Sequence, residues 1–341
     1  MQKGSFVSRV LLIRHGDRTP LSSFPNLPYP PPDRPMDDPA KSLGVLTDLG
    51  RSQMFQLGKE QAAQFHKFHP PRVSIHSSAV DRCVESARFF RRGFCSSFAT
   101  QILDPVPVKT TPIHADRLLF PQGDAVMRTK LGLFRHGPTW RTAEQHCRPF
   151  LKQISTLTGT KSTLWDISGV NTTLNYYQTH GLRLPPQVTP AFMHRVRDMT
   201  RLRNGLLYPV IAGHVARPLL AEVTRLLAQG GSHPGAHLAV ILLHDVNLLA
   251  LLSHLGLGLP LPRMGAWMQF QMRGMVGGAG AGAVGAAGQH QHQHQHQHQH
   301  DRGGGVPAPR VELIAAVAQF ARPLRACMGL KELTDRAAAT A

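Results

Sequence analysis

The stretch that decides the fold is residues 7–20, VSRVLLIRHGDRTP. Residues 10–13 form a short, continuous apolar run, which is typical of a strand buried on both faces in an α/β sheet. We expect this strand to deliver Arg14, His15 and Arg18 to the carboxyl edge of the sheet, where open α/β sheets bind their ligands. Two guanidinium groups around an imidazole suit a dianion such as a phosphate monoester, because guanidinium groups bind phosphate oxygens bidentately.

A second apolar strand is predicted over residues 236–243, AHLAVILL, and it ends at His244 and Asp245. A helix is predicted to resume at Asn247, with the sequence NLLALLSHL. Packing alone gives no reason for two buried strands to end in charged residues at one edge of a sheet. The coincidence therefore indicates one shared site at that edge.

A third segment lies between a predicted strand over residues 72–76 and a predicted helix over residues 80–98. The turn between them contains SSAVDR and ends at Arg82. A lone arginine at the start of a helix is ordinarily solvated. Arg82 becomes a site candidate only together with the other two segments.

These segments resemble the histidine phosphatase superfamily, in its branch of acid phosphatases and phytases. RHGDRTP is similar to the RHGxRxP signature of that family, and the strand followed by His244, Asp245 and a helix is similar to its second catalytic motif. SSAVDR looks like a turn whose last arginine, here Arg82, is the third guanidinium on the phosphate. The segment LTDLGRSQMFQLG resembles the packing helix that follows the first loop, and we expect it to be capped by Thr47 and to run to about residue 68.

The resemblance implies a phosphomonoesterase that works through a phosphohistidine intermediate. His15 would attack phosphorus, and Asp245 would protonate the leaving group and then deprotonate water. The resemblance assigns the phosphate oxygens to four donors, which are Arg14, Arg18, Arg82 and, if it is protonated, His244. We expect no metal and no other cofactor, because the guanidinium groups supply the positive charge.

The substrate is expected to be a phosphate monoester, and several classes stay open. The packing helix and the surroundings of His244 and Asp245 look most like the lysophosphatidic acid phosphatases of this branch. A basic protein would also suit a lysophospholipid on an anionic membrane surface. Phytate-type and sugar-phosphate substrates are alternatives, and so is a catalytically weak relative that only binds phosphorylated ligands.

The chain departs from the family pattern at two positions. His76 stands where relatives usually have arginine, so one peripheral positive charge would depend on pH. Gln271 stands where relatives usually carry glutamate, which weakens a structural hydrogen bond but not the reaction. A second RHG triplet at residues 135–137 lacks a preceding strand and a following arginine, so we exclude it from the site. Six further residues are pocket candidates, although each fits an ordinary helix or loop position better: His114, Asp116, Tyr176, Tyr177, His180 and His194.

The order of the elements predicts an α/β fold, with a central mixed, mostly parallel sheet flanked by helices and an inserted helical lobe. We expect the phosphatase core to comprise residues 1–110 and 231–325, and the lobe to comprise residues 111–230.

A hairpin is predicted near the end of the chain. Residues 266–272 would form one strand, and residues 311–320 would close the hairpin as the last strand. Between them, residues 273–308 contain a Gly/Ala-rich tract and six Gln-His repeats at residues 289–300. Such a segment cannot bury enough apolar surface to fold, so we predict a disordered insertion.

The 341 residues carry a formal net charge of +18. The arginines are spread over the whole chain and no nucleic-acid-binding motif accompanies them, so we expect anionic substrates and no nucleic-acid partner. No apolar run reaches 18 residues, so we expect no transmembrane segment. The four cysteines show no metal-binding spacing and no signal-peptide pattern opens the chain, which predicts a cytoplasmic protein by default, with mitochondrial and membrane-surface locations as alternatives. The oligomeric state is not decided by the sequence.

Overall fold

A computed structural model describes residues 5–29, 42–65, 71–98, 106–232, 235–259, 261–275, 310–316 and 324–329. Its strands are β1 (Ser5–Arg14), β2 (Arg72–Ser78), β3 (Val108–Thr111), β4 (Gly235–Leu243), β5 (Trp267–Met275), β6 (Arg310–Ala316) and β7 (Leu324–Gly329). Its α-helices are α1 (Asp48–Ala63), α2 (Asp81–Cys95), α3 (Ala125–Arg135), α4 (Pro138–Thr158), α5 (Ile167–Thr179), α6 (Pro190–Gly231) and α7 (Asp245–His254).

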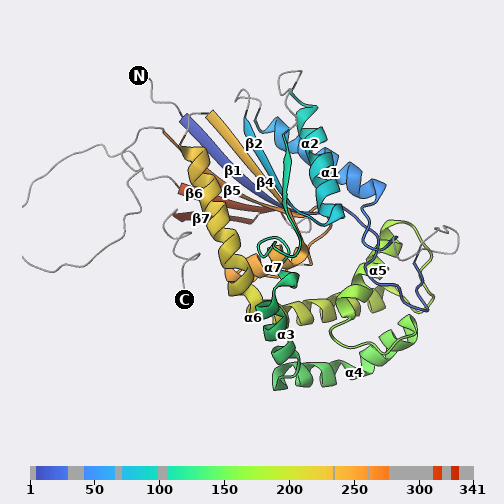
Figure 1. The fold of residues 1–341 in the computed structure, drawn as a ribbon. Helices are drawn as coiled ribbons and strands as arrows, with labels where there is room; N and C mark the ends of the chain where they lie inside the picture. Colours follow the sequence, from blue (N-terminus) through green and yellow to red (C-terminus); the bar gives the residue numbers. More distant parts are fainter. Residues whose placement is uncertain are drawn as a thin grey trace, which may run out of the picture.

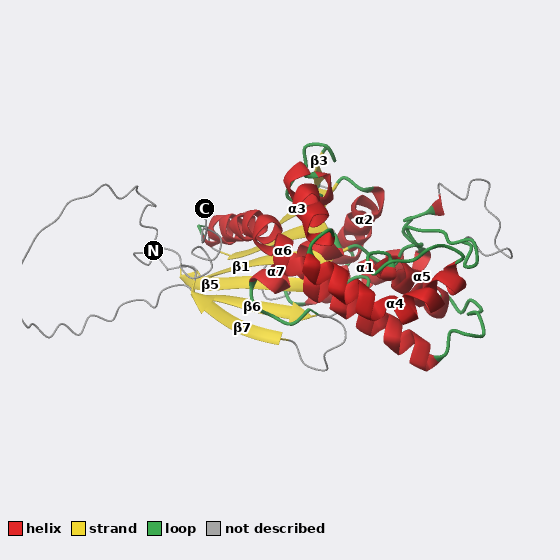
Figure 2. Ribbon diagram, turned by 90° about the horizontal axis from the view of Figure 1, so that it is seen from below, coloured by secondary structure: helices red, strands yellow, loops and turns green. Residues whose placement is uncertain are grey.

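The described strands form one seven-stranded sheet in the order β3-β2-β4-β1-β5-β6-β7. β3, β2, β4 and β1 pair in parallel, whereas β5, β6 and β7 are each antiparallel to the strand before them in that order. Five of the seven strands therefore point the same way, because β6 runs in the direction of β1. The predicted mixed, mostly parallel sheet with flanking helices is confirmed (Figures 1 and 2).

The sheet is buried on both faces, which explains the uninterrupted apolar run in β1. Leu11 and Ile13 belong to a core that they share with α1 and α2, and Val10 and Leu12 belong to a second core with α6 and α7. Successive side chains of a strand point to opposite faces, so both faces require apolar residues. Figure 1 shows α6 along one side of the sheet and α1 with α2 on the other.

The helices α3, α4, α5 and the first part of α6 pack around a core of their own, which includes Trp140, Ile154 and Val196. α6 then continues along the sheet, where Leu219 and Val223 are fully buried. By length and composition α6 is able to cross a membrane, since one window of 18 residues has a mean hydropathy of 1.2. Half of that window is buried inside the protein, as in the core helix of a globular fold, so α6 is weak evidence for a membrane span.

Several boundaries differ from the sequence prediction. α1 ends at Ala63 rather than near residue 68, and α2 ends at Cys95 rather than at residue 98. β5 continues to Met275 because it pairs with both β1 and β6, so residues 273–275 belong to the sheet rather than to the predicted insertion. The Gln-His repeats at residues 289–300 lie outside the described residues. β6 is not the last strand, because β7 pairs with it and extends the sheet past the expected core boundary at residue 325. α7 begins at Asp245 rather than Asn247, because the preceding residue already acts as the helix cap.

α1 and α2 cross in close contact at two glycines. A Cβ atom on Gly58 would lie 2.1 Å from the carbonyl oxygen of Phe90. A Cβ atom on Gly93 would lie 1.9 Å from the carbonyl oxygen of Phe55. Both distances are too short for any side chain, so this crossing requires glycine at both positions. The crossing fixes α2, whose first turn carries Arg82, against α1.

Gly93→Ala should lower the free energy of unfolding by about 2–3 kcal/mol, because the added methyl group forces the two helices apart. The matched control is Gly205→Ala in α6, where a Cβ atom would meet nothing within 4 Å. That change should raise the free energy of unfolding by about 0.5–1 kcal/mol, since alanine favours the helix. Denaturant unfolding of the three proteins measures both effects, and a neutral or stabilising Gly93→Ala would contradict the tight crossing.

Candidate active site

The parallel pairing of β1 with β4 brings the two predicted site segments together. Arg14 is the register partner of Leu243, so the next residues, His15 and His244, leave the sheet side by side. The centroids of their imidazole rings are 5.8 Å apart. β2 lies on the other side of β4, and the hydroxyl oxygen of Ser78 at its end is 3.2 Å from Nε2 of His244. The carboxyl ends of three neighbouring strands therefore build one site, as the sequence predicts.

His15 is a buried imidazole whose tautomer is set by its own loop. The residue is 2% exposed, and its Nδ1 is 2.9 Å from the carbonyl oxygen of Gly16. A carbonyl oxygen only accepts, so Nδ1 carries the proton and the lone pair of the neutral ring is on Nε2. Burial lowers the pKa of His15 well below its ordinary value, and the charges of Arg14 and Arg18 lower it further. His15 is therefore a neutral imidazole in mild acid, with a nucleophilic Nε2.

The positive charges of three arginines act on His15. These are Arg14, Arg18 and Arg82. Each has a buried Nε–H with no hydrogen-bond acceptor among the described residues. Burial and the repulsion of its neighbours lower the pKa of Arg18 to about 9, so its guanidinium is charged in neutral and acidic solution. Buried donors without acceptors fit an anion with several oxygens, such as a phosphate group.

Asp245 is the first residue of α7, and its carboxylate side chain is 44% exposed. Oδ2 accepts a hydrogen bond from Nη2 of Arg14 at 3.0 Å, and Oδ1 accepts one from the backbone N–H of Val246 at 2.9 Å. Burial raises the pKa of Asp245, but the charges of Arg14 and Arg18 outweigh that effect and hold it below its ordinary value. Asp245 is therefore ionised in this charge environment.

His244 is held in its neutral form, whereas the resemblance makes it a phosphate donor only if it is protonated. Nη2 of Arg82 lies 3.4 Å from Nδ1 of His244, so Nδ1 accepts and Nε2 carries the proton toward Ser78. Burial and the charge of Arg82 lower the pKa of His244 to about 4, although Asp245 acts in the opposite direction. His244 is neutral above that pH. The guanidinium groups, rather than this imidazole, supply the positive charge of the site.

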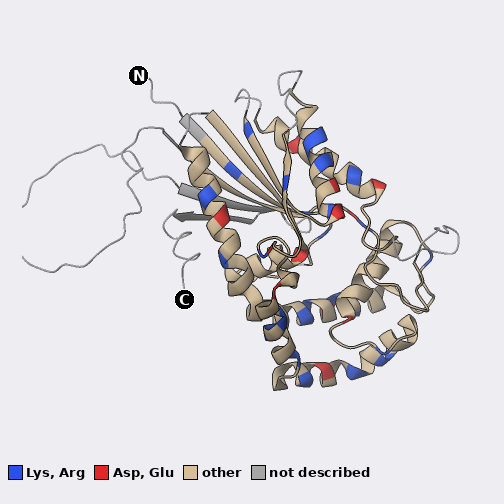
Figure 3. Ribbon diagram, in the orientation of Figure 1, with Lys and Arg blue, Asp and Glu red and all other residues tan. Residues whose placement is uncertain are grey.

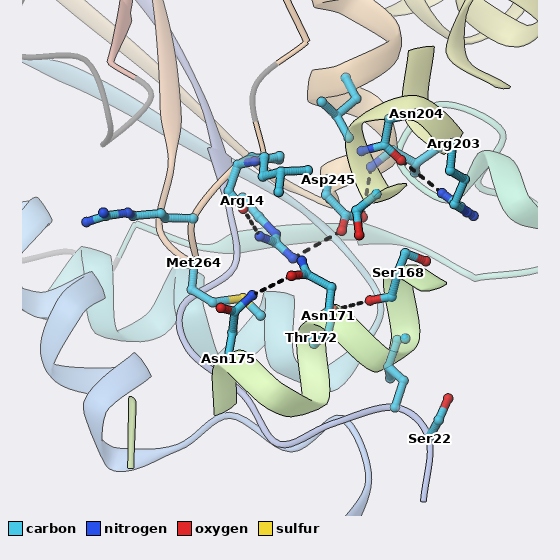
Figure 4. A pocket seen from close by; sticks show the side chains of 18 of the residues that line it. Arg14, Ser22, Ser168, Asn171, Thr172, Asn175, Arg203, Asn204, Asp245 and Met264 are labelled. Atoms are coloured by element: carbon cyan, nitrogen blue, oxygen red, sulfur yellow. Dashed lines mark hydrogen bonds and ion pairs between the residues drawn. The ribbon is translucent and has the colours of Figure 1, made fainter. Parts of the chain in front are cut away.

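A cavity of about 970 Å³ opens between the carboxyl edge of the sheet and the helical lobe (Figure 4). Arg14, Arg18 and Asp245 lie on its sheet side. On the lobe side, α5 contributes a row of hydroxyl and amide groups, which are Ser168, Asn171, Thr172 and Asn175. The cavity is thus polar and positively charged at the end where the two strand motifs meet.

α6 contributes a second wall that was not predicted from the sequence. Thr200, Arg203, Asn204, Leu207 and Ile211 line the cavity at helical spacing. The spacing itself was readable in the sequence. Which face of a long helix meets the site depends on how α6 packs on the sheet, and the sequence pattern does not contain that information.

Tyr176 is the one weaker candidate in the cavity lining. His180 is not a lining residue, but its Nε2 lies 2.8 Å from Oδ2 of Asp17 in the first loop, which is one. This contact joins the end of α5 to the loop that carries His15. Tyr177 has a structural role instead, because its hydroxyl donates to the carbonyl oxygen of Pro28 at 2.7 Å.

The other weaker candidates lie away from the cavity lining. His114 and His194 are exposed, and so are Arg135 and His136 of the second RHG triplet. Asp116 is buried, and its Oδ1 accepts a hydrogen bond from the backbone N–H of Leu119. Across the described ranges, no three His, Cys, Asp or Glu side chains gather as ligands to a metal ion would.

The two departures from the family pattern have local explanations. His76 is half-buried in β2, where burial lowers its pKa and the nearest charges come from Glu222 and Lys109 rather than from the site arginines. The expectation that His76 adds a peripheral charge to the phosphate site is therefore not supported. Gln271 keeps a structural hydrogen bond, because its Oε1 accepts from Nε of Arg9 at 2.7 Å.

Comparison with known proteins assigns this fold and its two strand motifs to one family. The sequence profile described as "Histidine phosphatase superfamily (branch 2)" matches residues 6–276, and the chain belongs to this family. It is 31% identical to lysosomal acid phosphatase of Homo sapiens over 263 residues, covering 71% of this chain and 60% of the relative. Testicular acid phosphatase of Homo sapiens is 29% identical over 286 residues, covering 75% of this chain and 65% of the relative.

Among solved structures, the apo form of Hafnia alvei phytase is similar in fold. The TM-score is 0.63 with 14% sequence identity, and the match covers 98% of this chain and 97% of that one. The chain spans about 60% of the length of the lysosomal acid phosphatase that it matches.

Lys and Arg residues are distributed over α1, α2, α6 and the lobe helices rather than confined to the site (Figure 3).

The neutral state of His244 predicts a pH-dependent stability. Its pKa is about 4 in the folded protein, against an ordinary value of 6.5, so unfolding takes up a proton between these values. Stability should therefore fall as the pH drops from about 6.5 towards about 4, by at most roughly 1.4 kcal/mol per pH unit from this residue. His15 acts in the same direction.

Denaturant unfolding of the wild type and of His244→Gln at pH 7 and pH 4.5 isolates this contribution. The wild type should lose about 2–3 kcal/mol more than the variant over that range. Equal losses in the two proteins would show that His244 is not held neutral by the fold.

Proposed function

We propose that the protein is a phosphomonoester hydrolase of the acid phosphatase type that works through a phosphohistidine at His15. The observation that carries this proposal is the neutral His15, with its lone pair on Nε2, among guanidinium groups that have buried donors without acceptors. Phosphoryl transfer depends mainly on positioning and on charge stabilisation, and this site supplies both. Arg14, Arg18 and Arg82 are proposed to hold the non-bridging oxygens.

In the first step, Nε2 of His15 forms a bond to phosphorus while the bond from phosphorus to the ester oxygen breaks. Asp245 gives its proton to that oxygen, and the alcohol leaves. In the second step, a water molecule gives a proton to Asp245 and attacks phosphorus. The bond from phosphorus to Nε2 then breaks, so inorganic phosphate and the neutral imidazole of His15 are regenerated.

Asp245 must be protonated when the substrate reacts, although it is ionised beside Arg14 and Arg18. A bound phosphate group brings negative charge to the same arginines, which weakens their effect on the carboxyl and raises its pKa. Acidic solution also favours the protonated form. His15 is neutral there, so the nucleophile is in its working form in mild acid, and the bound phosphate favours the protonated form of Asp245.

We propose lysophosphatidic acid as the substrate, with phytate-type and sugar phosphates as the alternatives. Support for an amphipathic leaving group comes from an apolar part of the cavity wall, which includes Met127, Leu131, Leu207, Ile211 and Leu249. The row of hydroxyl and amide groups on α5 favours a hydroxylated leaving group.

The cytoplasmic compartment and the division of the chain into a core and a lobe stay predictions.

His15→Ala should lower the hydrolysis of an aryl phosphate by roughly 10⁴-fold or more, because the nucleophile is removed. The matched control is His136→Ala in the second RHG triplet, whose histidine is exposed. This control should hydrolyse the substrate at the wild-type rate. Turnover by His15→Ala within tenfold of the wild type would contradict the assignment.

Asp245→Asn should slow the hydrolysis of an alkyl phosphate by roughly 10²–10⁴-fold in single-turnover experiments, because the alkoxide leaves without a proton. The same variant should slow 4-nitrophenyl phosphate by less than about tenfold, since that leaving group needs little protonation. Comparison of the first step for the two substrates separates acid catalysis from water activation. Equal losses on both substrates would remove Asp245 as the acid.

A further inference from the structure

Arg203 on α6 is a half-buried cation in the cavity wall with neutral neighbours. Nε donates to the carbonyl oxygen of Trp165 at 3.1 Å, and Nη1 donates to Oδ1 of Asn204 at 3.0 Å. The hydroxyl of buried Tyr208 is a third hydrogen-bond neighbour. The guanidinium also lies over the Trp165 ring, 5.1 Å from its centroid. Its position is therefore fixed from several sides.

No carboxylate neutralises Arg203 within the part of the chain that the structure describes. The two acidic residues that act on it most are Asp245 and Asp166, and neither forms an ion pair with it. Asp245 binds Arg14, and Asp166 accepts from the backbone N–H and hydroxyl of Thr163 at 2.9 and 2.7 Å. A fixed, partly desolvated charge without a counter-ion is costly unless a ligand supplies the opposite charge.

The location of Arg203 relative to the proposed general acid indicates which part of a substrate it meets. Arg203 and Asn204 lie in the same cavity as Asp245, and Figure 4 shows these residues on one side of it, with α5 on the other. In the proposed reaction, the transferred phosphate lies at the sheet edge with His15 and the three site arginines, and Asp245 delivers its proton to the ester oxygen on the cavity side of that phosphate. Groups on the helical side of the cavity, such as Arg203 on α6, therefore face the leaving group rather than the transferred phosphate.

We propose that Arg203 is a specificity-determining residue that binds an oxygen acceptor on the leaving group, and that it binds an anionic acceptor, a carboxylate or a second phosphate, most strongly. The assignment rests on the proposed phosphomonoesterase function and deepens it. It orders phosphate monoesters by their leaving groups: an anionic acceptor first, a neutral hydroxyl or ester oxygen second, and a purely alkyl group last. The glycerol unit of a lysophosphatidic acid belongs to the second class, while its acyl chain depends on the apolar wall.

The test compares kcat/KM at pH 5.5 for 3-phosphoglycerate, glycerol 3-phosphate and propyl phosphate. These leaving groups are similar in size and carry a carboxylate, hydroxyl groups or no acceptor. A second pair, 1,3-propanediol bisphosphate against 3-hydroxypropyl phosphate, tests whether a phosphate acts as a carboxylate does. The wild type should favour the anionic member of each comparison, by about 10- to 100-fold against propyl phosphate.

Arg203→Met should reduce this preference to within about threefold, and Arg203→Lys should retain part of it, because lysine keeps the charge but not the planar fork. The matched control is Arg225→Met on the same helix, since Arg225 lies outside the cavity lining, is 48% exposed and already pairs with Glu222 at 2.6 Å. The control should keep the wild-type preference. If Arg203 acted only in folding, its variants would have a lower kcat/KM for all substrates together, and the ratios between substrates would not change.

Two results would overturn the assignment. One is a wild-type enzyme that hydrolyses propyl phosphate and 3-phosphoglycerate with equal kcat/KM. The other is a preference that survives in both Arg203 variants. Failure of the wild type to hydrolyse any of these esters would instead contradict the proposed function itself, so the two failures are distinguishable.

Discussion

One hydrogen bond, from Nδ1–H of His15 to the carbonyl oxygen of Gly16, decides the chemistry available at this site. It places the lone pair of a neutral imidazole on Nε2, and burial beside guanidinium groups keeps that imidazole neutral in mild acid. The same guanidinium groups provide donors for a phosphate group. Nucleophilicity and anion binding therefore have a common physical origin, which is positive charge concentrated around a buried imidazole. The proposed function requires both.

The fold supports this arrangement from several directions. The register of β1 against β4 sets His15 beside His244, and close backbone contact holds the first loop against α1, where a Cβ atom on Gly16 would lie 2.5 Å from the carbonyl oxygen of Gly50. Asp17 accepts hydrogen bonds from Thr47 at the start of α1 and from His180 at the end of α5. The loop is thus held by the core and by the lobe. In this way the helices that form the cavity wall are coupled to the loop that carries the proposed nucleophile.

Much of the site was predictable because its residues follow buried strands. A strand buried on both faces gives a continuous apolar run, so β1 and β4 were located correctly, and the polar residues after them had to share one edge. Other features depend on three-dimensional packing. The neutral state of His244 results from burial beside Arg82, which the order of residues does not encode. Arg203 was missed because the face of α6 that meets the cavity is set by tertiary contacts. β7 was missed because its six residues, LRACMG, are too short and mixed to give a clear alternation.

The most direct test of the account is to identify the atom that carries the phosphoryl group during turnover. The protein would be mixed with a labelled aryl phosphate, quenched in alkali to preserve phosphohistidine, and studied by phosphorus NMR and peptide mass spectrometry. The account predicts one phosphorylated residue, His15, with the phosphoryl group on Nε2, because Nδ1 is occupied by its proton and the Gly16 carbonyl oxygen. A phosphoryl group on Nδ1 of His15, or on any other residue, would contradict it.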